Sequence, residues 1–276
     1  MREDADILVT GPLRGWRDAP EVRPDANRRL RWIQTVSSGI DSFPHWLLQG
    51  RLVSTGRGLT ASRIAEYVMA AILRRQKPLE ATAVRGGNWN EMPLASVAGQ
   101  RLGIVGFGAI GQEIVRRASA FDMEICVVRR SPAVQESGDV RFCAGIDDLL
   151  PWADHLVLAL PSTPESRNIL SRERLMTARP GLHVINISRG DLLDQDGLLA
   201  AIGAGQVGYA TLDVTTPEPL PAGHPMLDHP DILITPHNAW SGDDWQAAFQ
   251  ARVLRGLDAI ARGANPEYLV DPSRGY

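Results

Sequence analysis

The chain has 276 residues, of which 44% are hydrophobic and 22% charged, and its formal net charge is −3. These values are typical of a soluble globular protein with one large domain or two of ordinary size, and they argue against a disordered or fibrous chain. Because the sequence has no cluster of Lys and Arg and no run of about 18 apolar residues, we expect neither a nucleic acid nor a membrane as a partner.

The N-terminal third is predicted to form a small domain. Its first residues, MREDADILV, lack the basic and then apolar pattern of a secretory leader, so we expect a cytoplasmic protein. Short apolar runs predict three strands, and a longer stretch with helical periodicity predicts a helix after them. The strands are residues 5–10, 30–36 and 51–54, and the helix is residues 62–84.

From about residue 99 onward, short apolar runs alternate with stretches of helical character. The predicted strands are residues 102–106, 124–128, 155–160, 183–188, 209–214 and 231–235. The predicted helices are residues 110–120, 146–150, 171–177 and 195–204. Continuous apolar strands separated by helices are typical of a parallel sheet buried on both faces. We therefore predict an α/β fold with a doubly wound parallel sheet of the Rossmann type.

The last predicted element is an amphipathic helix over residues 243–261. We assign it, with the N-terminal third, to a substrate domain made of residues 1–60 and 240–276. A dinucleotide-binding domain of residues 61–239 is inserted between these two parts. Hinges are expected at the long helix and near residues 236–241, and the cleft between two domains is where small-molecule sites usually form.

A glycine-rich turn, GFGAIG, follows the first strand of the larger domain. Gly106 allows the tight turn, Gly108 lets the backbone approach a pyrophosphate, and Gly111 allows the helix to pack closely on the sheet. The N–H groups at the helix start, around Ala109 and Ile110, attract phosphate charge. Since strand, turn, helix and next strand follow in the required order, the motif predicts a dinucleotide site. The alternative is an ordinary structural turn.

The end of the next strand indicates which dinucleotide is bound. NAD-binding folds usually carry Asp or Glu about 20 residues after the glycines, where it binds the ribose 2′-hydroxyl. The sequence here has Arg129, Arg130 and Ser131, whose guanidinium groups and hydroxyl suit a 2′-phosphate. We therefore expect NADP, with NAD as the alternative. If the arginines do not bind phosphate, they are solvated surface charges.

The two cysteines, Cys126 and Cys143, lie in or near apolar runs and at no metal-ligand spacing. They are typical of reduced thiols rather than of a disulfide framework, and no metal site is expected.

Three polar residues follow later strands, at the edge of a parallel sheet where ligands bind. Taken singly, each residue has a simpler interpretation. Arg189 would form a surface ion pair, Glu218 would lie in an exposed turn between two prolines, and His237 would be a packed or exposed histidine without a catalytic role. Together they match the reduction of a 2-keto acid. An arginine holds the substrate carboxylate, a histidine protonates the forming alkoxide, and a carboxylate favours the imidazolium form.

Six segments, in order, resemble the D-isomer-specific 2-hydroxyacid dehydrogenase family: LRWIQTVSSGID, RLGIVGFGAIGQEIVRR, LALPSTPESRNIL, VINISRGDLLDQDGLLAAI, LDVTTPEPLP and ILITPHN. The resemblance runs over essentially the whole chain, from about Ala5 to the C-terminal helix. It implies a small flavodoxin-like substrate domain, which here is shorter at the N-terminus by on the order of 40 residues.

The resemblance also implies roles for individual residues. Arg189 corresponds to the substrate-binding arginine, Glu218 to the family glutamate and His237 to the general acid. Further positions implied to contact substrate are Ser38 and Gly39, and those implied to contact the coenzyme are Leu160, Pro161, Ile187 and Asp213. Members with arginines in place of the ribose-binding Asp use NADPH and tend to be glyoxylate or hydroxypyruvate reductases. The family is usually homodimeric, through the coenzyme domain and the long helix.

Several positions depart from the family pattern and affect specificity. Thr215 replaces an aromatic residue, and the segment Asn238-Ala239-Trp240 replaces a small apolar run. Arg57 could reach the substrate pocket, and so could Trp89, although hinge packing is the preferred interpretation of Trp89. Two alternative functions stay open: a dinucleotide-sensing interaction protein, like the C-terminal-binding-protein corepressors, and a dehydrogenase of an unusual acid, like phosphite and formate dehydrogenases.

Overall fold

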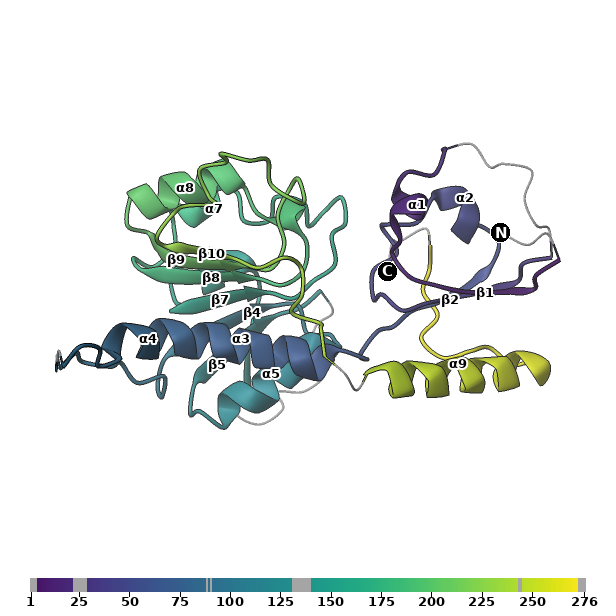
Figure 1. The fold of residues 1–276 in the computed structure, drawn as a ribbon, viewed down its shortest axis with the longest axis horizontal. Coiled ribbons are helices and arrows are strands. Elements are labelled where there is room, and N and C mark those ends of the chain that lie inside the picture. Colours follow the sequence, from purple (N-terminus) through teal and green to yellow (C-terminus); the bar gives the residue numbers. More distant parts are fainter. Residues whose placement is uncertain are drawn as a thin grey trace. The chain divides into compact units, whose positions relative to one another are not determined.

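The structure is a computed structural model, and it describes residues 4–21, 29–87, 89, 91–130, 140–242 and 245–272. The chain divides into two compact units (Figure 1). The small unit contains Met1–Thr60 and Ser241–Tyr276, and the large unit contains Ala61–Trp240. The units are described separately below.

The large unit contains a parallel sheet of seven strands in the order β10-β9-β8-β7-β4-β5-β6. Its strands are β4 (Arg101–Val105), β5 (Glu124–Val128), β6 (Val140–Cys143), β7 (His155–Leu158), β8 (Leu182–Asn186), β9 (Val207–Leu212) and β10 (Ile232–Ile234). The strand order reverses between β4 and β7. In such folds, ligands bind in the crevice at the carboxyl ends of the strands where this reversal occurs. The predicted α/β fold with a Rossmann-type sheet is confirmed.

Helices cover both faces of this sheet, which explains why its central strands carry no polar alternation. In Figure 1, α3 (Ala61–Gln76) and α5 (Ala109–Ser119) lie on one face, and α7 (Arg172–Leu175) and α8 (Gln195–Gly203) lie on the other. Each face has its own apolar core, one around Ile72, Ile104 and Ile114 and the other around Leu156 and Leu198. The short α6 (Ile146–Leu149) and the 3-10 turn η1 (Gly190–Leu192) complete the unit.

Two elements of the large unit differ from the sequence prediction. The helix predicted over residues 62–84 is wrong in its second half, because α3 ends at Gln76 and only a short α4 (Leu79–Thr82) follows. Pro78 explains the break, since proline donates no backbone hydrogen bond and disfavours helical geometry in the residue before it. Strand β6 was not predicted from the sequence.

The small unit contains a parallel sheet of three strands, β1 (Ile7–Thr10), β2 (Trp32–Thr35) and β3 (Leu52–Ser54). In Figure 1, α1 (Arg14–Arg17) and α2 (His45–Leu48) lie on one side of the sheet and α9 (Trp245–Ala261) on the other. Gly256 allows α9 to approach closely, because a β-carbon there would lie 2.3 Å from the buried indole of Trp32. No helix in the described part of the chain combines the length and hydropathy that a bilayer crossing requires.

The expectation of two free thiols is wrong. A disulfide joins Cys126 of β5 to Cys143 of β6, with their Cα atoms 6.3 Å apart. The register explains the contact, because Cys143 pairs with Val128 and therefore lies diagonally across from Cys126 on the same face of the sheet.

Candidate functional site

The glycine-rich turn lies between β4 and α5, at the point where the strand order reverses. A β-carbon on Gly106, which has a φ of +108°, would lie 2.3 Å from the carbonyl oxygen of Ala159, and one on Gly111 would lie 2.3 Å from the carbonyl oxygen of Gly106. These two glycines are therefore required by close packing within the turn. Gly108 differs, because a β-carbon there would meet nothing within 4 Å.

The space beside Gly108 lies at the start of α5, whose N-terminus has no side-chain cap. Unpaired N–H groups at a helix start attract a phosphate, and an open approach beside glycine admits one. The turn therefore fits the pyrophosphate of a dinucleotide.

At the end of β5, Arg129 is half-buried and stacks on an aromatic ring. Its Cζ atom lies 4.5 Å from the centroid of the Phe142 ring, and its Nε is buried without an acceptor among the described residues. A buried guanidinium donor without an acceptor fits an anionic ligand. Arg130 is exposed, and Ser131 lies outside the described residues.

Arg189 follows β8 and is half-buried. The side chain of Asn186 shapes this loop, since its Nδ2 donates to the carbonyl of Arg189 (2.8 Å) and its Oδ1 accepts from the N–H of Ser188 (3.1 Å). A β-carbon on Gly190 would lie about 2 Å from the carbonyl group of Thr215. The Arg189 loop therefore packs against the backbone that leads to Glu218.

Glu218 and His237, which are 19 residues apart, meet directly. His237 Nδ1 lies 2.8 Å from Glu218 Oε1, and each side chain is about one-third exposed. Because Nδ1 donates to the carboxylate, Nε2 is left as the nitrogen that can exchange a proton with a ligand. The pair has the form of a general acid with its orienting carboxylate.

Asp213 holds the loop that carries His237. Its buried carboxylate accepts hydrogen bonds from the Thr235 hydroxyl (2.6 Å) and from the N–H groups of Asn238 (2.9 Å) and Ala239 (3.0 Å). Thr235 uses its single proton on Asp213, so the Tyr67 hydroxyl of α3 donates to Thr235 Oγ1 (2.7 Å). Burial, with the nearby charge of Asp213, raises the pKa of Tyr67 above its usual value.

The other predicted site residues lie at strand ends. Leu160 and Pro161 follow β7, and the buried Ile187 follows β8. Ser38 and Gly39 follow β2 in the small unit, where Ser37 Oγ donates to the carbonyl of Gly39 (2.8 Å). The large unit thus gathers its predicted residues at the carboxyl edge of one sheet.

Sequence reasoning missed several residues that shape this site. The side chain of Phe142 contacts Arg129, that of Thr235 contacts Asp213, and Tyr67 reaches the site through Thr235. Each of these side-chain contacts joins separate elements, so no local pattern marks them. Trp240 was noted only as a departure, yet its Nε1 donates to the carbonyl of His237 (2.8 Å). The preferred interpretation of Trp89 as hinge packing is wrong, because this residue is 78% exposed.

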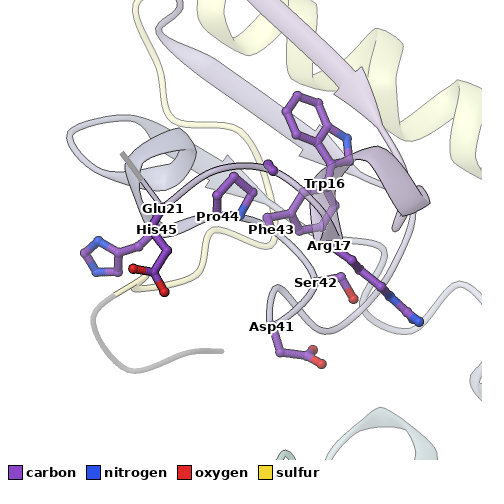
Figure 2. Close-up of a pocket in the computed structure, with 9 residues that line it drawn as sticks. Trp16, Arg17, Glu21, Asp41, Ser42, Phe43, Pro44 and His45 are labelled. Carbon is purple, nitrogen blue, oxygen red and sulfur yellow. The ribbon is translucent and has the colours of Figure 1, made fainter. Parts of the chain in front are cut away.

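The small unit also has an open pocket of about 480 Å³, shown in Figure 2. Trp16, Phe43 and Pro44 form its apolar part, and charged groups such as Arg17 and Asp41 lie at its margin. None of the predicted site residues lines it, so we do not assign it to the reaction.

Comparison with known proteins places these features in a family. Residues 67–239 match the family model described as D-isomer specific 2-hydroxyacid dehydrogenase, NAD binding domain. Glyoxylate/hydroxypyruvate reductase A of Serratia proteamaculans is 30% identical over 278 residues, which cover 95% of this chain and 86% of the relative. D-3-phosphoglycerate dehydrogenase of Methanocaldococcus jannaschii is 29% identical over 98% of this chain, and the chain spans about half (52%) of that relative.

A solved structure has the same fold. The NADPH-dependent glyoxylate/hydroxypyruvate reductase of Sinorhizobium meliloti, in complex with NADP and sulfate, superposes with a TM-score of 0.84 and is 27% identical. The match covers 99% of this chain and 87% of that one.

Proposed function

This chain belongs to the D-isomer specific 2-hydroxyacid dehydrogenase family of NAD(P)-binding oxidoreductases, and on that premise we propose that it reduces a small 2-keto acid to the D-2-hydroxy acid with NADPH. The substrate is of the glyoxylate or hydroxypyruvate type. The observation that carries the proposal is the 2.8 Å contact between His237 Nδ1 and Glu218 Oε1, at the sheet edge that carries the glycine-rich turn.

The side chains at this edge have complementary roles. Reduced nicotinamide, when bound, supplies the hydride. Arg189 binds the carboxylate of the keto acid and orients its carbonyl carbon. His237 protonates the carbonyl oxygen through Nε2, while Glu218 holds the imidazole and stabilises its cationic form.

The residues at the end of β5 support NADPH as the coenzyme. Arg129 offers a guanidinium group, and the described strand end has no carboxylate to bind a ribose 2′-hydroxyl. Glyoxylate and hydroxypyruvate are suggested as substrates by relatives that carry those names.

We assign coenzyme binding to the large unit, and in it to the turn residues Gly106–Gly111, to Arg129, and to Leu160, Pro161, Ile187 and Asp213. The contact to nicotinamide implied for Asp213 competes with the three hydrogen bonds that it accepts from the loop that carries His237. We assign part of the substrate site to Ser38 and Gly39 of the small unit, whose backbone N–H groups would bind the carboxylate.

A substrate panel tests this function. The full-length protein is incubated with NADPH or NADH and with glyoxylate, hydroxypyruvate, pyruvate or phenylpyruvate, and loss of the reduced nicotinamide absorbance is followed. We expect turnover with the small acids and a higher kcat/KM with NADPH. The His237→Ala protein, purified in the same way, controls for a contaminating reductase. Tight NADPH binding without turnover of any acid would contradict the proposal and favour a dinucleotide sensor.

A further inference from the structure

The Phe142 ring lies between the two groups that are proposed to bind the phosphates of the coenzyme. The Arg129 guanidinium lies over its face, 4.5 Å from the centroid. The Phe107 ring of the glycine-rich turn meets it edge to face, with centroids 5.4 Å apart and planes at 81°. A continuous stack therefore joins the pyrophosphate turn after β4 to the arginine after β5.

The strand that carries Phe142 is anchored against β5. Phe142 pairs in register with Val127, and Arg129 follows two residues later on the same face. On the opposite face, the disulfide between Cys126 and Cys143 ties the next residue of β6 to β5. The ring is thus part of a rigid surface, packed against the core that β5 shares with α5.

Stacking on the Phe142 ring restricts the conformations of the Arg129 side chain before the coenzyme binds. Arginine has several freely rotating bonds, and ordering it on binding a phosphate costs conformational entropy. A guanidinium that lies flat on an aromatic face keeps its N–H groups in its own plane, directed away from the ring. The contact with Phe142 therefore holds the Arg129 side chain, and its buried Nε keeps a donor without an acceptor in the described part of the chain.

We propose that Phe142 is a positioning residue for coenzyme selectivity, which holds the Arg129 guanidinium ready for the ribose 2′-phosphate of NADPH. The inference rests on the proposed use of NADPH and adds the residue that orients the phosphate-binding arginine. NADH lacks the 2′-phosphate, so its binding does not depend on how Phe142 holds Arg129.

Binding measurements on four variants of the full-length protein test the inference. Dissociation constants for NADPH and NADH are obtained by nicotinamide fluorescence for Phe142→Leu, Phe142→Tyr, Arg129→Gln and the double variant Arg129→Gln/Phe142→Leu. We expect Phe142→Leu to weaken NADPH binding about tenfold, a size consistent with a cation–π contact, and to leave NADH within twofold. Phe142→Tyr keeps the ring face and should retain the selectivity of the parent.

The double variant measures the coupling between the two residues. If Phe142 acts through Arg129, the double variant loses no more NADPH affinity than Arg129→Gln alone. Phe121→Leu, at an exposed position after α5, is a matched control that should change neither constant. Thermal unfolding of each variant shows whether the fold is retained, and Phe142→Tyr carries the test if Phe142→Leu does not fold.

The outcomes separate this inference from the proposed function. Equal loss of NADPH and NADH affinity in Phe142→Leu, unchanged NADPH affinity in that variant, or loss of selectivity in a folded Phe142→Tyr would overturn the role of Phe142. If Arg129→Gln nevertheless loses affinity for NADPH and not for NADH, the proposed binding of NADPH by Arg129 stands. Unchanged NADPH affinity in Arg129→Gln would overturn both the role of Phe142 and the role of Arg129.

Discussion

His237 owes its position to hydrogen bonds of its backbone. Its φ of 52° lies in the left-handed region, which residues with a β-carbon seldom adopt. The N–H of His237 donates to the carbonyl of Thr235 (2.9 Å), and its carbonyl accepts from Trp240 Nε1 (2.8 Å). With Asp213 binding the next two N–H groups, the turn is fixed on both sides and directs the imidazole to Glu218.

The Glu218–His237 contact predicts a specific kinetic effect. Glu218→Gln removes the negative charge and presents an amide donor to Nδ1, which favours the wrong tautomer of the imidazole. We expect kcat for keto-acid reduction to fall by on the order of 100-fold, with little change in KM or in NADPH affinity. Steady-state kinetics and coenzyme titration give these values.

Three further variants control that experiment. His237→Ala should abolish turnover and leave coenzyme binding nearly intact, and adding Glu218→Gln to it should cost little more, because the two residues act as one unit. Glu173→Gln, on the exposed first turn of α7, should behave like the parent. Full activity of Glu218→Gln would remove the glutamate from the mechanism.

At the scale of elements, the sequence predicts the strands of the large sheet that consist of apolar runs and misses the one that does not. Six of the seven strands in the large sheet appear as apolar runs, because both of their faces are covered. Strand β6 is an edge strand of four residues with an exposed Arg141, so VRFC gives no such signal. The helix predicted over residues 62–84 is interrupted at Pro78, because apolar periodicity carries no information on the missing backbone donor.

The candidate site divides in the same way. The packing of Gly106 and Gly111 was predictable, because a strand-turn-helix motif fixes local geometry. The meeting of Glu218 with His237 followed from the rule that parallel strands end at one edge. The contacts of Phe142 with Arg129 and of Tyr67 with Thr235 join separate elements, and only the folded sheet and helix bring them together.

A network of hydrogen-bonded, buried polar side chains crosses β7, β8 and β9 of the large sheet. His155 of β7 and His183 of β8 pair in register, with their Nδ1 atoms 3.1 Å apart. The outer nitrogens contact Gln100 Oε1 (2.6 Å) and Thr211 Oγ1 (2.9 Å). Gln100 Oε1 is an acceptor, so Thr211 donates to His183, His183 to His155, and His155 to Gln100, with both rings neutral.

The two buried histidines of this network predict a loss of stability in mild acid. Burial lowers the pKa of His155 from 6.5 to about 4, and burial also lowers the pKa of His183. The unfolded chain binds protons below about 6.5 while the folded chain does not, so the free energy of unfolding falls as pH drops from 6.5 towards 4. For His155 alone the loss between pH 7.5 and pH 5 is about 2 kcal/mol.

Urea unfolding at those two pH values measures the effect. In His155→Gln, the difference in unfolding free energy between the two pH values should shrink by about 2 kcal/mol. The same change at the exposed His45 of α2 should leave the pH dependence as it is in the parent. An unaltered pH dependence in His155→Gln would show that this histidine does not titrate on unfolding.

At the scale of the whole molecule, one segment of the large unit carries several exposed apolar side chains. We define the arm as residues 79–94, of which 88 and 90 lie outside the described residues. In Figure 1, α4 and the turn after it extend away from the body of the unit. Leu79, Val84 and Trp89 are each more than half exposed, and Met92 and Leu94 are also exposed. Apolar groups gathered in this way on an extended segment mark an interaction surface.

The homodimer that the family resemblance implies would use this arm, and an oligomerisation assay tests it. Trp89→Glu places a charge at the most exposed aromatic residue of the arm, where burial against a second copy would leave it unpaired. We expect the parent to be a dimer by light scattering coupled to size exclusion and the variant to be monomeric at micromolar concentration. Leu254→Glu, at a position on α9 that is 65% exposed, is the control that should stay dimeric. A monomeric parent would refute the homodimer, whereas a dimeric Trp89→Glu would show that the dimer forms without the arm.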